Sequence, residues 1–350
     1  MSSSHPLPIE VLSQGRAAVF EEPAGPSGVR IRERPTTRPK QGHVAVEIRA
    51  ASINHLDLWL AHGAQKIPPP RVICADGAGV VRESADPRWR AGAEVVIFPT
   101  LCCWECEQCR AGENVYCERF GVLGEHADGT ACELVHVDGR SVFPKPSGLS
   151  WAESAAFPLT FLTAWRMLVT RARLQPDETV LVIGAGAGVA VAAIAIARHI
   201  GARVLATSRS EAKRKRAMEL GAEAAFDSAG FSKPVRGLTG DGVDVVFEHV
   251  GAATIGESMR SLAMGGRIVT CGSTSGVNAE VSMPRLFFRH GSLIGSTMGN
   301  AAEFEAVLKA IDRGMRPVVD AVYPLNDVQA ALTRLDTAEQ FGKVVLSVSA

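Results

Sequence analysis

The feature that most constrains the fold is a regular alternation of compact apolar runs and Ala-rich stretches in the second half of the chain. Short apolar runs occur at residues 179–183, 203–206, 243–247 and 267–270, and helix-forming segments separate them. Runs of this length are typical of strands that are buried on both faces, and intervening helices allow such strands to pair in parallel. The pattern therefore predicts an α/β fold with a doubly wound parallel sheet over residues 155–314.

The first half of the chain has a different sequence pattern. Up to about Pro146, short β-branched runs such as residues 43–48 are interrupted by Gly and Pro, which is typical of short, irregular strands. The end of the chain returns to strand-like pieces of the same kind. We therefore expect a β-rich domain made of residues 1–154 and 315–350, which encloses the sheet domain of residues 155–314.

Composition excludes several classes of protein. The 350 residues are 46% hydrophobic and contain 37 Lys+Arg and 37 Asp+Glu, so the chain can bury a large core and carries no net charge. Such a balance gives no reason to expect nucleic acid or an acidic membrane surface as a partner. The sequence has no apolar run of membrane-spanning length and no apolar stretch typical of a secretory signal near its start. We therefore expect a cytoplasmic protein.

Cysteines are concentrated in one short segment. Five of the eight lie between Cys102 and Cys117, which suits a metal site in a reducing compartment better than a dispersed disulfide framework. Cys103, Cys106, Cys109 and Cys117 follow the pattern C-x2-C-x2-C-x7-C, which lets four thiolates converge on one Zn²⁺. Four cysteine ligands leave no position for water or substrate, so we expect one structural zinc per chain. A redox dithiol is the alternative.

A glycine-rich turn follows the first apolar run of the sheet domain. Residues 184–188 read Gly-Ala-Gly-Ala-Gly and precede an Ala- and Ile-rich helix that ends near Gly201. Glycines let the backbone approach a pyrophosphate, whose charge then lies at the helix N-terminus. The last small residue of this fingerprint is Ala190 rather than Gly. In its βαβ context the segment predicts a dinucleotide site rather than a simple tight turn.

The end of the second predicted strand indicates which dinucleotide binds. An acidic side chain there would accept hydrogen bonds from the ribose 2′-hydroxyl of NAD, but the sequence has no carboxylate before Glu211. Ser208, Arg209 and Lys213 instead offer hydrogen bonds and positive charge to a 2′-phosphate. We therefore expect NADP(H), although a solvent-exposed helix start would also explain the two basic residues.

These features together resemble the medium-chain dehydrogenase/reductase superfamily, which includes zinc-containing alcohol dehydrogenases and quinone oxidoreductases. The resemblance covers nearly the full chain, up to the terminal Gly342-Lys343. It implies a GroES-like catalytic domain, a Rossmann cofactor domain and a homodimer or homotetramer. The cofactor-binding residues expected from the patterns and the resemblance are Thr163, Gly184, Gly186, Ala187, Gly188, Val189, Ser208, Arg209, Lys213, His249, Gly272, Ser273, Gly295, Ser296 and Lys343.

The chain departs from this family at its catalytic zinc site. The family places a Cys three residues before an Asp, a His just before an acidic residue, and a third Cys ahead of the cofactor domain. Here Asn54 stands at the first position, Ala75 stands at the second, and residues 157–160 contain neither Cys nor His. Zinc activation of an alcohol is hard to build without such donors. The departures favour the zinc-independent reductases, which transfer hydride to activated C=C bonds.

A narrower similarity points the same way. Residues 246–249 and 265–276 resemble the crotonyl-CoA carboxylase/reductase branch, in which an Asn, a Glu and a His surround the nicotinamide. Asn54, Glu125 and His249 match these three in local context. The resemblance therefore implies that they line the active site.

The same residues suggest roles in reduction. Gly124 stands where that branch has a large aromatic residue, so we expect simple reduction rather than carboxylation. Asn54 and His249 are the expected hydrogen-bond donors to the oxygen on which charge develops, and His55, Glu125 or His249 would relay a proton. Each also has a structural explanation: Asn54 as a helix cap, His249 as a loop residue, and Glu125 as part of the zinc lobe.

Three functions stay open at this point. The first is NADPH-dependent reduction of α,β-unsaturated carbonyl compounds, including quinones and enoyl thioesters. The second is an alcohol dehydrogenase with an unusual zinc site drawn from His55, Asp57, Cys74 and Asp76. The third is a non-catalytic NADPH-binding protein, comparable to the lens crystallins that resemble this superfamily. The predicted substrate loops contain no motif that names a ligand, so the substrate stays open as well.

Overall fold

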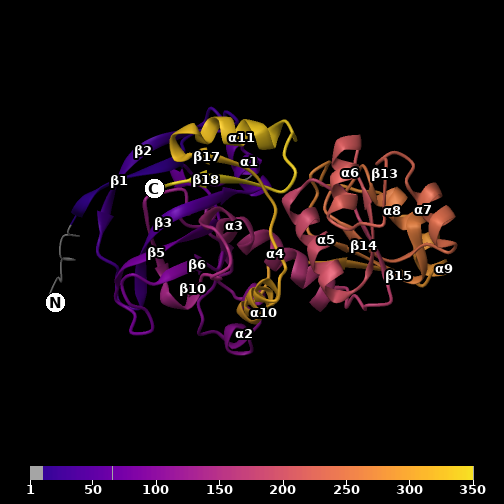
Figure 1. Cartoon of the computed structure of the whole chain (residues 1–350), viewed down its shortest axis with the longest axis horizontal. Helices are drawn as coiled ribbons and strands as arrows, with labels where there is room; N and C mark the ends of the chain where they lie inside the picture. The colour runs from indigo at the N-terminus through magenta and orange to yellow at the C-terminus, as the bar shows by residue number, and fades with distance from the viewer. Residues whose placement is uncertain (1–10, 65, 350) are drawn as a thin grey trace, which may run out of the picture.

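The computed structural model describes residues 11–64 and 66–349, and it has two lobes that lie side by side (Figure 1). One lobe contains the first part of the chain together with its C-terminal end, and the other contains the middle. This arrangement confirms the predicted α/β fold with a β-rich domain and a doubly wound domain. No helix of the described residues is long and apolar enough to cross a membrane.

The β-rich lobe is built around β3 (His43–Ile53), the central strand of a seven-stranded sheet. β3 pairs antiparallel with β5 (Asp76–Ser84) on one side and with β18 (Lys343–Ser347) on the other, so the C-terminal strand joins the N-terminal half of the chain. The exact boundaries of the two domains stay a prediction. The other strands of this lobe are β1 (Val11–Phe20), β2 (Val29–Thr37), β4 (Arg71–Val72), β6 (Glu94–Ile97), β7 (Thr100–Leu101), β8 (Gly121–Val122), β9 (Leu134–Asp138), β10 (Val142–Pro144) and β17 (Val319–Pro324).

The second lobe has a six-stranded parallel sheet in the order β13-β12-β11-β14-β15-β16. The chain winds outward from β11 to β13 and then returns to β14, so the strand order reverses between β11 and β14. In such sheets ligands bind beyond the carboxyl ends of the strands at this reversal. The six strands are β11 (Thr179–Val182), β12 (Arg203–Thr207), β13 (Ala224–Phe226), β14 (Val243–Glu248), β15 (Leu262–Thr270) and β16 (Ser292–Gly295).

Helices cover the sheets and connect the lobes. The first lobe carries α1 (His55–Ala61), α2 (Glu107–Arg110), α3 (Trp151–Ala156) and α11 (Val328–Asp336). The second carries α5 (Gly188–Ile200), α6 (Glu211–Glu219), α7 (Ser232–Thr239), α8 (Ile255–Ser261) and α9 (Met283–Phe288), while α4 (Pro158–Trp165) and α10 (Ala301–Asp312) lie at the junction of the two lobes (Figure 1). A π-helical segment, η3 (Arg166–Arg171), extends α4, and single 3₁₀ turns occur at η1 (Asn114–Tyr116), η2 (Gly139–Ser141) and η4 (Leu325–Asp327).

The two lobes share one continuous apolar core, which fixes their relative orientation. Phe98 comes from the first lobe, Phe157 from the link into the second, and Phe304 from α10. The ring centroids of Phe98 and Phe304 are 5.5 Å apart, and those of Phe157 and Phe304 are 5.9 Å apart. All three rings are buried, and packed aromatic pairs at such distances stabilise a core beyond simple burial.

Candidate cofactor and active site

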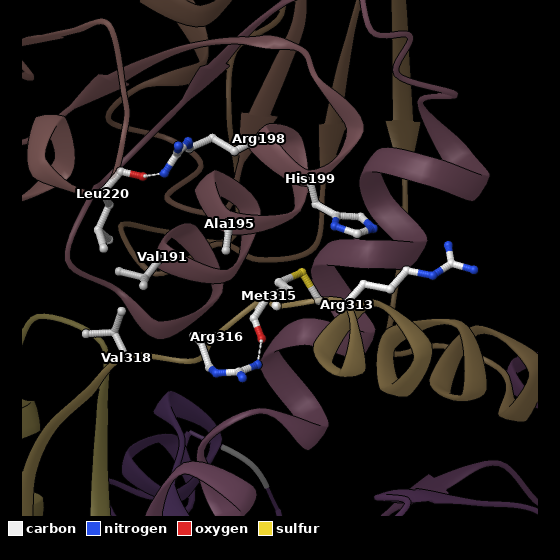
Figure 2. Close-up of a pocket in the computed structure, with 10 residues that line it drawn as sticks. Val191, Ala195, Arg198, His199, Leu220, Arg313, Met315, Arg316 and Val318 are labelled. Carbon is white, nitrogen blue, oxygen red and sulfur yellow. Dashed lines mark hydrogen bonds between the residues drawn. The ribbon is translucent and has the colours of Figure 1, made fainter. Parts of the chain in front are cut away.

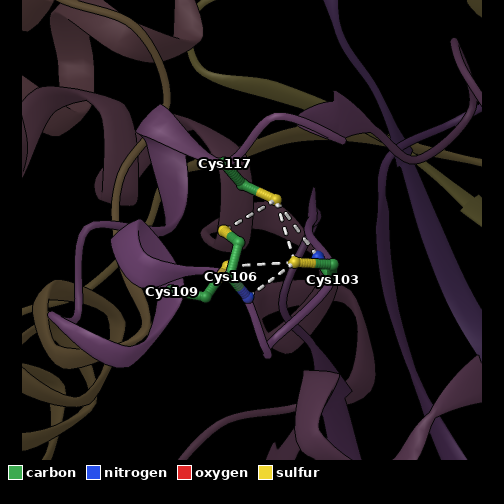
Figure 3. A group of neighbouring side chains, drawn as sticks. All are labelled: Cys103, Cys106, Cys109 and Cys117. Carbon is green, nitrogen blue, oxygen red and sulfur yellow. Dashed lines mark hydrogen bonds between the residues drawn. The ribbon is translucent and has the colours of Figure 1, made fainter.

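The four predicted zinc ligands are brought together in the structure. The sulfur atoms of Cys103, Cys106, Cys109 and Cys117 lie within 4.8 Å of one another (Figure 3). Sγ–Sγ distances are 3.8 Å for Cys103–Cys109, 3.9 Å for Cys106–Cys117 and 3.5 Å for Cys103–Cys117. Four sulfurs placed tetrahedrally at the Zn–S bond length are about 3.8 Å apart. The donor set therefore fits a zinc ion.

The cysteine lobe is anchored on the start of α10, which lies at the junction of the two lobes (Figure 1). The backbone N–H of Val115 donates to Asn300 Oδ1 at 3.1 Å, and the N–H of Ala301 donates to Asn114 Oδ1 at 3.0 Å. A change that unfolds the cysteine loop would therefore also disturb the contact between the two domains.

The glycine turn has the conformation that a dinucleotide site needs. Gly184 and Gly186 have φ values of 72° and 118°, a region that side chains rarely adopt. α5 begins at Gly188, and its N-cap residue Ala187 has no side chain that accepts from the first N–H groups. These N–H groups are thus free to bind an anion at the positive end of the helix.

Each glycine of the turn lies against a predicted site residue. A Cβ added at these glycines would lie 3.0 Å from His249 Nε2 at Gly184, 2.6 Å from Lys213 Cδ at Gly186, and 2.9 Å from Lys343 Cδ at Gly188.

The other predicted cofactor residues lie mainly at the carboxyl ends of the parallel strands. Ser208 follows β12 and is buried, while Arg209 is exposed and has no carboxylate partner among the described residues. Ser296 follows β16, and its buried Oγ has no partner in the described part of the chain. These positions fit a dinucleotide laid across the carboxyl edge of the sheet. The remaining members of the set are Val189 at the start of α5, Gly272 and Ser273 after β15, Gly295 at the end of β16, and Thr163 in α4.

A buried polar network lies where the two domains meet. Asp76, Lys343 and Asn54 are 0%, 4% and 5% exposed. Asp76 Oδ2 accepts from Lys343 Nζ at 3.0 Å, from Asn54 Nδ2 at 2.9 Å and from Ser52 Oγ at 3.2 Å. Its Oδ1 accepts from the backbone N–H of Leu159 at 2.7 Å. Lys343 Nζ also donates to Asn54 Oδ1.

This network stands where the family's catalytic zinc donors are missing. Asn54 is the first departing position, Asp76 directly follows the second at Ala75, and Leu159 lies within the third at residues 157–160. All three therefore meet around the carboxylate of Asp76. The ammonium of Lys343 and the amide of Asn54 therefore occupy the positions at which the family would bind its catalytic zinc.

The alternative zinc set does not assemble. Both carboxylate oxygens of Asp57 accept backbone N–H groups, from Asn54 at 2.7 Å and from Cys74 at 2.8 Å. His55 lies at the exposed start of α1, with its ring edge-on to Trp59. Among the described residues, the four-cysteine group is the one cluster whose ligand atoms gather as a metal site requires. Asn54 is also the N-cap residue of α1.

His249 is fixed by the end of β11. Its Nε2 lies 2.9 Å from the carbonyl oxygen of Ile183, which can only accept, so Nε2 carries the proton. Burial lowers the pKa of His249, so the ring is neutral and Nδ1 is an acceptor. In this form His249 does not donate to a developing oxyanion. Of the two donors predicted from the sequence, Asn54 is therefore the one that stays a candidate.

A carboxylate that the sequence analysis did not single out holds the His249 loop. Glu248 Oε1 accepts from the backbone N–H groups of His249, Val250 and Gly251 at 3.0, 2.7 and 3.1 Å. Its position, as an acidic residue at the end of an apolar run, was the sequence signal that could have identified it. Glu248 thus positions the loop that borders the glycine turn.

The remaining predicted catalytic residues are His55 and Glu125. His55 has solvent-exposed surface, but its ring is partly desolvated, and this desolvation, followed by the nearby His249, lowers its pKa. Glu125 lies in the turn after β8, with Oε2 3.7 Å from His126 Nδ1. The neighbouring Gly124 lies against the backbone of Cys74, where an added Cβ would come within 2.8 Å. A larger residue at position 124 would therefore push this turn away from the backbone of Cys74.

A separate cavity of about 380 Å³ lies between α5 and the segment that returns to the first lobe (Figure 2). Its lining includes Arg198, which donates to Leu220 O at 2.8 Å, and Arg316, which donates to Ile311 O at 2.8 Å. These arginines bind carbonyl groups near helix ends. Because the lining contains none of the predicted site residues, we assign the cavity no part in the chemistry.

Comparison with known proteins agrees with these features. The zinc-binding dehydrogenase family matches residues 188–313, and the alcohol dehydrogenase GroES-like domain matches residues 40–147. Crotonyl-CoA carboxylase/reductase of Cereibacter sphaeroides is 28% identical over 330 residues, which cover 83% of this chain and 77% of that protein.

Solved structures show the same relationship. A crystal structure of an NAD-dependent alcohol dehydrogenase is 41% identical, with a TM-score of 0.92 over 95% of this chain and 100% of that one. A 2-octenoyl-CoA carboxylase reductase in complex with NADP and 2-octenoyl-CoA is 26% identical, with a TM-score of 0.90 over 97% of this chain and 88% of that one. With both domain families matched and a solved relative at 41% identity, the chain belongs to the medium-chain dehydrogenase/reductase superfamily of oxidoreductases.

Proposed function

We propose that the protein reduces the polarised C=C bond of an α,β-unsaturated carbonyl compound with NADPH, with enoyl thioesters as the first choice and quinones as the second. The observation that carries this proposal is the Lys343–Asp76–Asn54 network at the positions of the missing zinc donors. Activation then comes from hydrogen bonds. Conjugated acceptors suit such a site, because hydride addition to them yields a delocalised enolate. The relatives that act on crotonyl-CoA and 2-octenoyl-CoA support the choice of thioesters.

The two solved relatives use different dinucleotides: one is NAD-dependent and the other is in complex with NADP. The choice of NADPH therefore rests on this chain's own residues. Ser208 and Arg209 follow β12, and the sequence has no carboxylate after this strand before Glu211; the nearby Asp227 is paired with Arg214. Arg214 is held by Asp227 at 2.9 Å and by the carbonyl of Ser208, whereas the exposed Arg209 keeps its charge available. This arrangement supports recognition of a 2′-phosphate by Arg209.

The residues of the site divide the chemistry as follows. When bound, the nicotinamide supplies the hydride, so that acceptor, NADPH and one proton give the saturated carbonyl compound and NADP⁺. Asn54 donates a hydrogen bond to the acceptor's carbonyl oxygen. His55 is exposed and has a lowered pKa, so it is suited to pass the proton from solvent to the α-carbon. Neutral His249 shapes the wall next to Gly184.

We also propose that the four-cysteine loop holds one structural zinc ion. The sulfur spacing supports this, and a closed Cys₄ site leaves no ligand position for substrate. Thiolate ligands persist best in a reducing compartment, which supports the cytoplasm as the location.

We further propose a homodimer that forms through β16. This strand is at the edge of the six-stranded sheet and pairs only with β15 among the described strands. Leu293 in this strand is exposed, and so are Phe287 and Phe288 at the end of α9. An unpaired edge strand is its own complement across a two-fold axis, and apolar side chains around it favour such pairing. Phe288→Glu should therefore shift the sedimentation coefficient toward that of the monomer, whereas Leu238→Glu on α7 should not.

The function is tested by assaying the purified protein with a panel of enoyl-CoA thioesters, enones, quinones and primary alcohols. We expect NADPH oxidation with conjugated acceptors and no effect of EDTA on the rate. Efficient alcohol oxidation that is lost on chelation would favour the zinc-dependent alcohol dehydrogenase instead. A protein that binds NADPH and turns over none of the panel would be the non-catalytic alternative.

A further inference from the structure

We propose that Lys343 is a catalytic residue, whose ammonium binds the acceptor's carbonyl oxygen together with the amide of Asn54. This inference rests on the proposed function and adds a donor that carries a full positive charge. The sequence predicts Lys343 only as a cofactor contact, but the structure directs its ammonium beyond the glycine turn to Asp76 and Asn54.

The count of hydrogen bonds leaves two donor protons free. An ammonium group has three protons, and Lys343 donates to Asn54 Oδ1 and Asp76 Oδ2. A side-chain amide has two, and Asn54 Nδ2 donates one of them to Asp76 Oδ2. No described residue accepts the third ammonium proton or the second amide proton. The two nitrogens that carry them both contact the same carboxylate oxygen, so they lie side by side.

Asp76 holds the two donors, Lys343 Nζ and Asn54 Nδ2, without fully neutralising the charge of the ammonium. Its two oxygens accept four hydrogen bonds, from Lys343, Asn54, Ser52 and the backbone of Leu159. The carboxylate charge is thus shared among four donors rather than matched to Lys343 alone. Because the group is fully buried, its orientation is fixed before the substrate arrives. Preorganised donors of this kind stabilise an oxyanion without rearranging during the reaction.

The backbone places the side chain of Lys343 next to the predicted cofactor turn. Gly342 has a φ of 100° and its N–H donates to Gly186 O at 3.0 Å, which ties the start of β18 to the glycine turn. The stem of Lys343 then passes Gly188, where an added Cβ would lie 2.9 Å from its Cδ. Its ammonium therefore lies between the cofactor turn and Asn54, at the junction of the two domains.

The proposal is tested first with Lys343→Ala and with Lys309→Met as the matched control, since Lys309 is exposed on α10. We expect Lys343→Ala to lower kcat by about 10²–10³, as is usual when a donor to an oxyanion is removed. The affinity for NADPH, measured by fluorescence titration without acceptor, should change little because only the stem of Lys343 contacts the turn. Lys309→Met should match the parent in both.

Chemical rescue separates a catalytic from a structural role. Methylammonium should restore part of the turnover of Lys343→Ala, because it supplies the missing donor, whereas tetramethylammonium, which has no N–H, should not. Turnover of the variant within tenfold of the parent, or a loss confined to NADPH affinity, would overturn the assignment. Lost turnover that neither amine restores, in a variant that still binds NADPH like the parent, would also overturn it.

The failure of the proposed function has a different signature. If the parent reduces no conjugated acceptor but oxidises alcohols, the reductase function fails and the enolate-binding role of Lys343 fails with it. If the parent reduces these acceptors and Lys343→Ala does so equally well, only the assignment of Lys343 is wrong.

Discussion

The ammonium of Lys343 donates a hydrogen bond to the carboxylate of Asp76 at 3.0 Å, although 267 residues separate the two in the chain. They meet because β5 and β18 pair with opposite edges of β3, and each residue is the first of its strand. The ion pair therefore ties the C-terminal strand to the wall of the active site.

Removing one partner of this pair should destabilise the protein strongly. Asp76→Ala leaves a buried ammonium without its counter-charge, and such changes cost about 3–5 kcal/mol. We expect a fall of this size in the free energy of unfolding measured with urea. Glu223→Gln, which breaks the exposed pair with Arg203, should cost less than about 1 kcal/mol.

A double variant checks that the loss comes from the unpaired charge. Asp76→Leu combined with Lys343→Met should recover much of the stability, because an apolar pair of similar volume replaces the ions. If Asp76→Ala unfolds at the same urea concentration as the parent, the pair contributes nothing to stability and the ammonium has found another partner.

Asp57 should give the stability a pH dependence of known sign. Burial raises the pKa of Asp57 from its ordinary value of 3.8 to about 6. The folded state therefore holds this proton more tightly than the unfolded chain, and stability is lost as the pH rises between these two values. The difference between the two pKa values corresponds to about 3 kcal/mol. The free energy of unfolding of the parent, minus that of Asp57→Asn, should fall by about this amount between pH 4 and pH 7.

Asp86 provides a control of the opposite sign. The guanidinium of Arg88 lowers the pKa of Asp86, so its contribution is present at neutral pH and is lost as the pH falls through the lowered value. The free energy of unfolding of the parent, minus that of Asp86→Asn, should therefore rise with pH in the acid range. A flat difference for Asp57→Asn would mean that Asp57 keeps its ordinary pKa.

Zinc analysis should find one ion per chain. The cysteine lobe has few buried apolar residues of its own, so its fold depends on the metal. Cys106→Ser should lower both zinc content and melting temperature, while Cys102→Ser should leave both unchanged because Cys102 lies outside the four-sulfur group. Two zinc ions in the parent would point to a second, catalytic site.

Much of the fold was predictable because its signals are local. The apolar runs that become β11, β12, β14 and β15 are evident in the sequence, and so is the glycine turn. β13 was missed because it has three residues, of which two are Ala. β16 was also missed, since its four residues, Ser-Leu-Ile-Gly, are too few to form a clear apolar run.

The polar network at the site was not predictable from any local pattern. Asn54, Asp76 and Lys343 lie on three separate segments, and only the pairing of strands brings them together. The hydrogen bond from His249 to Ile183 O likewise depends on the packing of β14 against β11. The sequence therefore pointed to candidate residues but not to which of their atoms are free to contact a ligand.

The preference for NADPH should depend on Arg209. Removing a charged hydrogen bond to phosphate costs about 1.5–3 kcal/mol, which is about one to two decades in affinity. Arg209→Ala should weaken NADPH binding by this factor and leave NADH binding nearly unchanged. Lys215→Ala, on the exposed face of α6, is the control and should change neither. An unaltered NADPH affinity in Arg209→Ala would show that Arg209 only faces solvent.

Replacing Asn54 and His249 should separate catalysis from cofactor binding. The sequence predicts a fall in kcat for both, but the proton on His249 Nε2 changes the expectation. Asn54→Ala removes a donor to the acceptor's oxygen and should lower kcat by about 10²–10³, with little change in NADPH affinity. His249→Ala leaves Ile183 O unpaired and opens space beside Gly184, so it should weaken NADPH binding by about one to two decades. His249→Gln can still donate to Ile183 O and should restore much of that affinity. If His249→Ala binds NADPH like the parent and loses only kcat, the neutral ring would be an essential part of the chemistry after all.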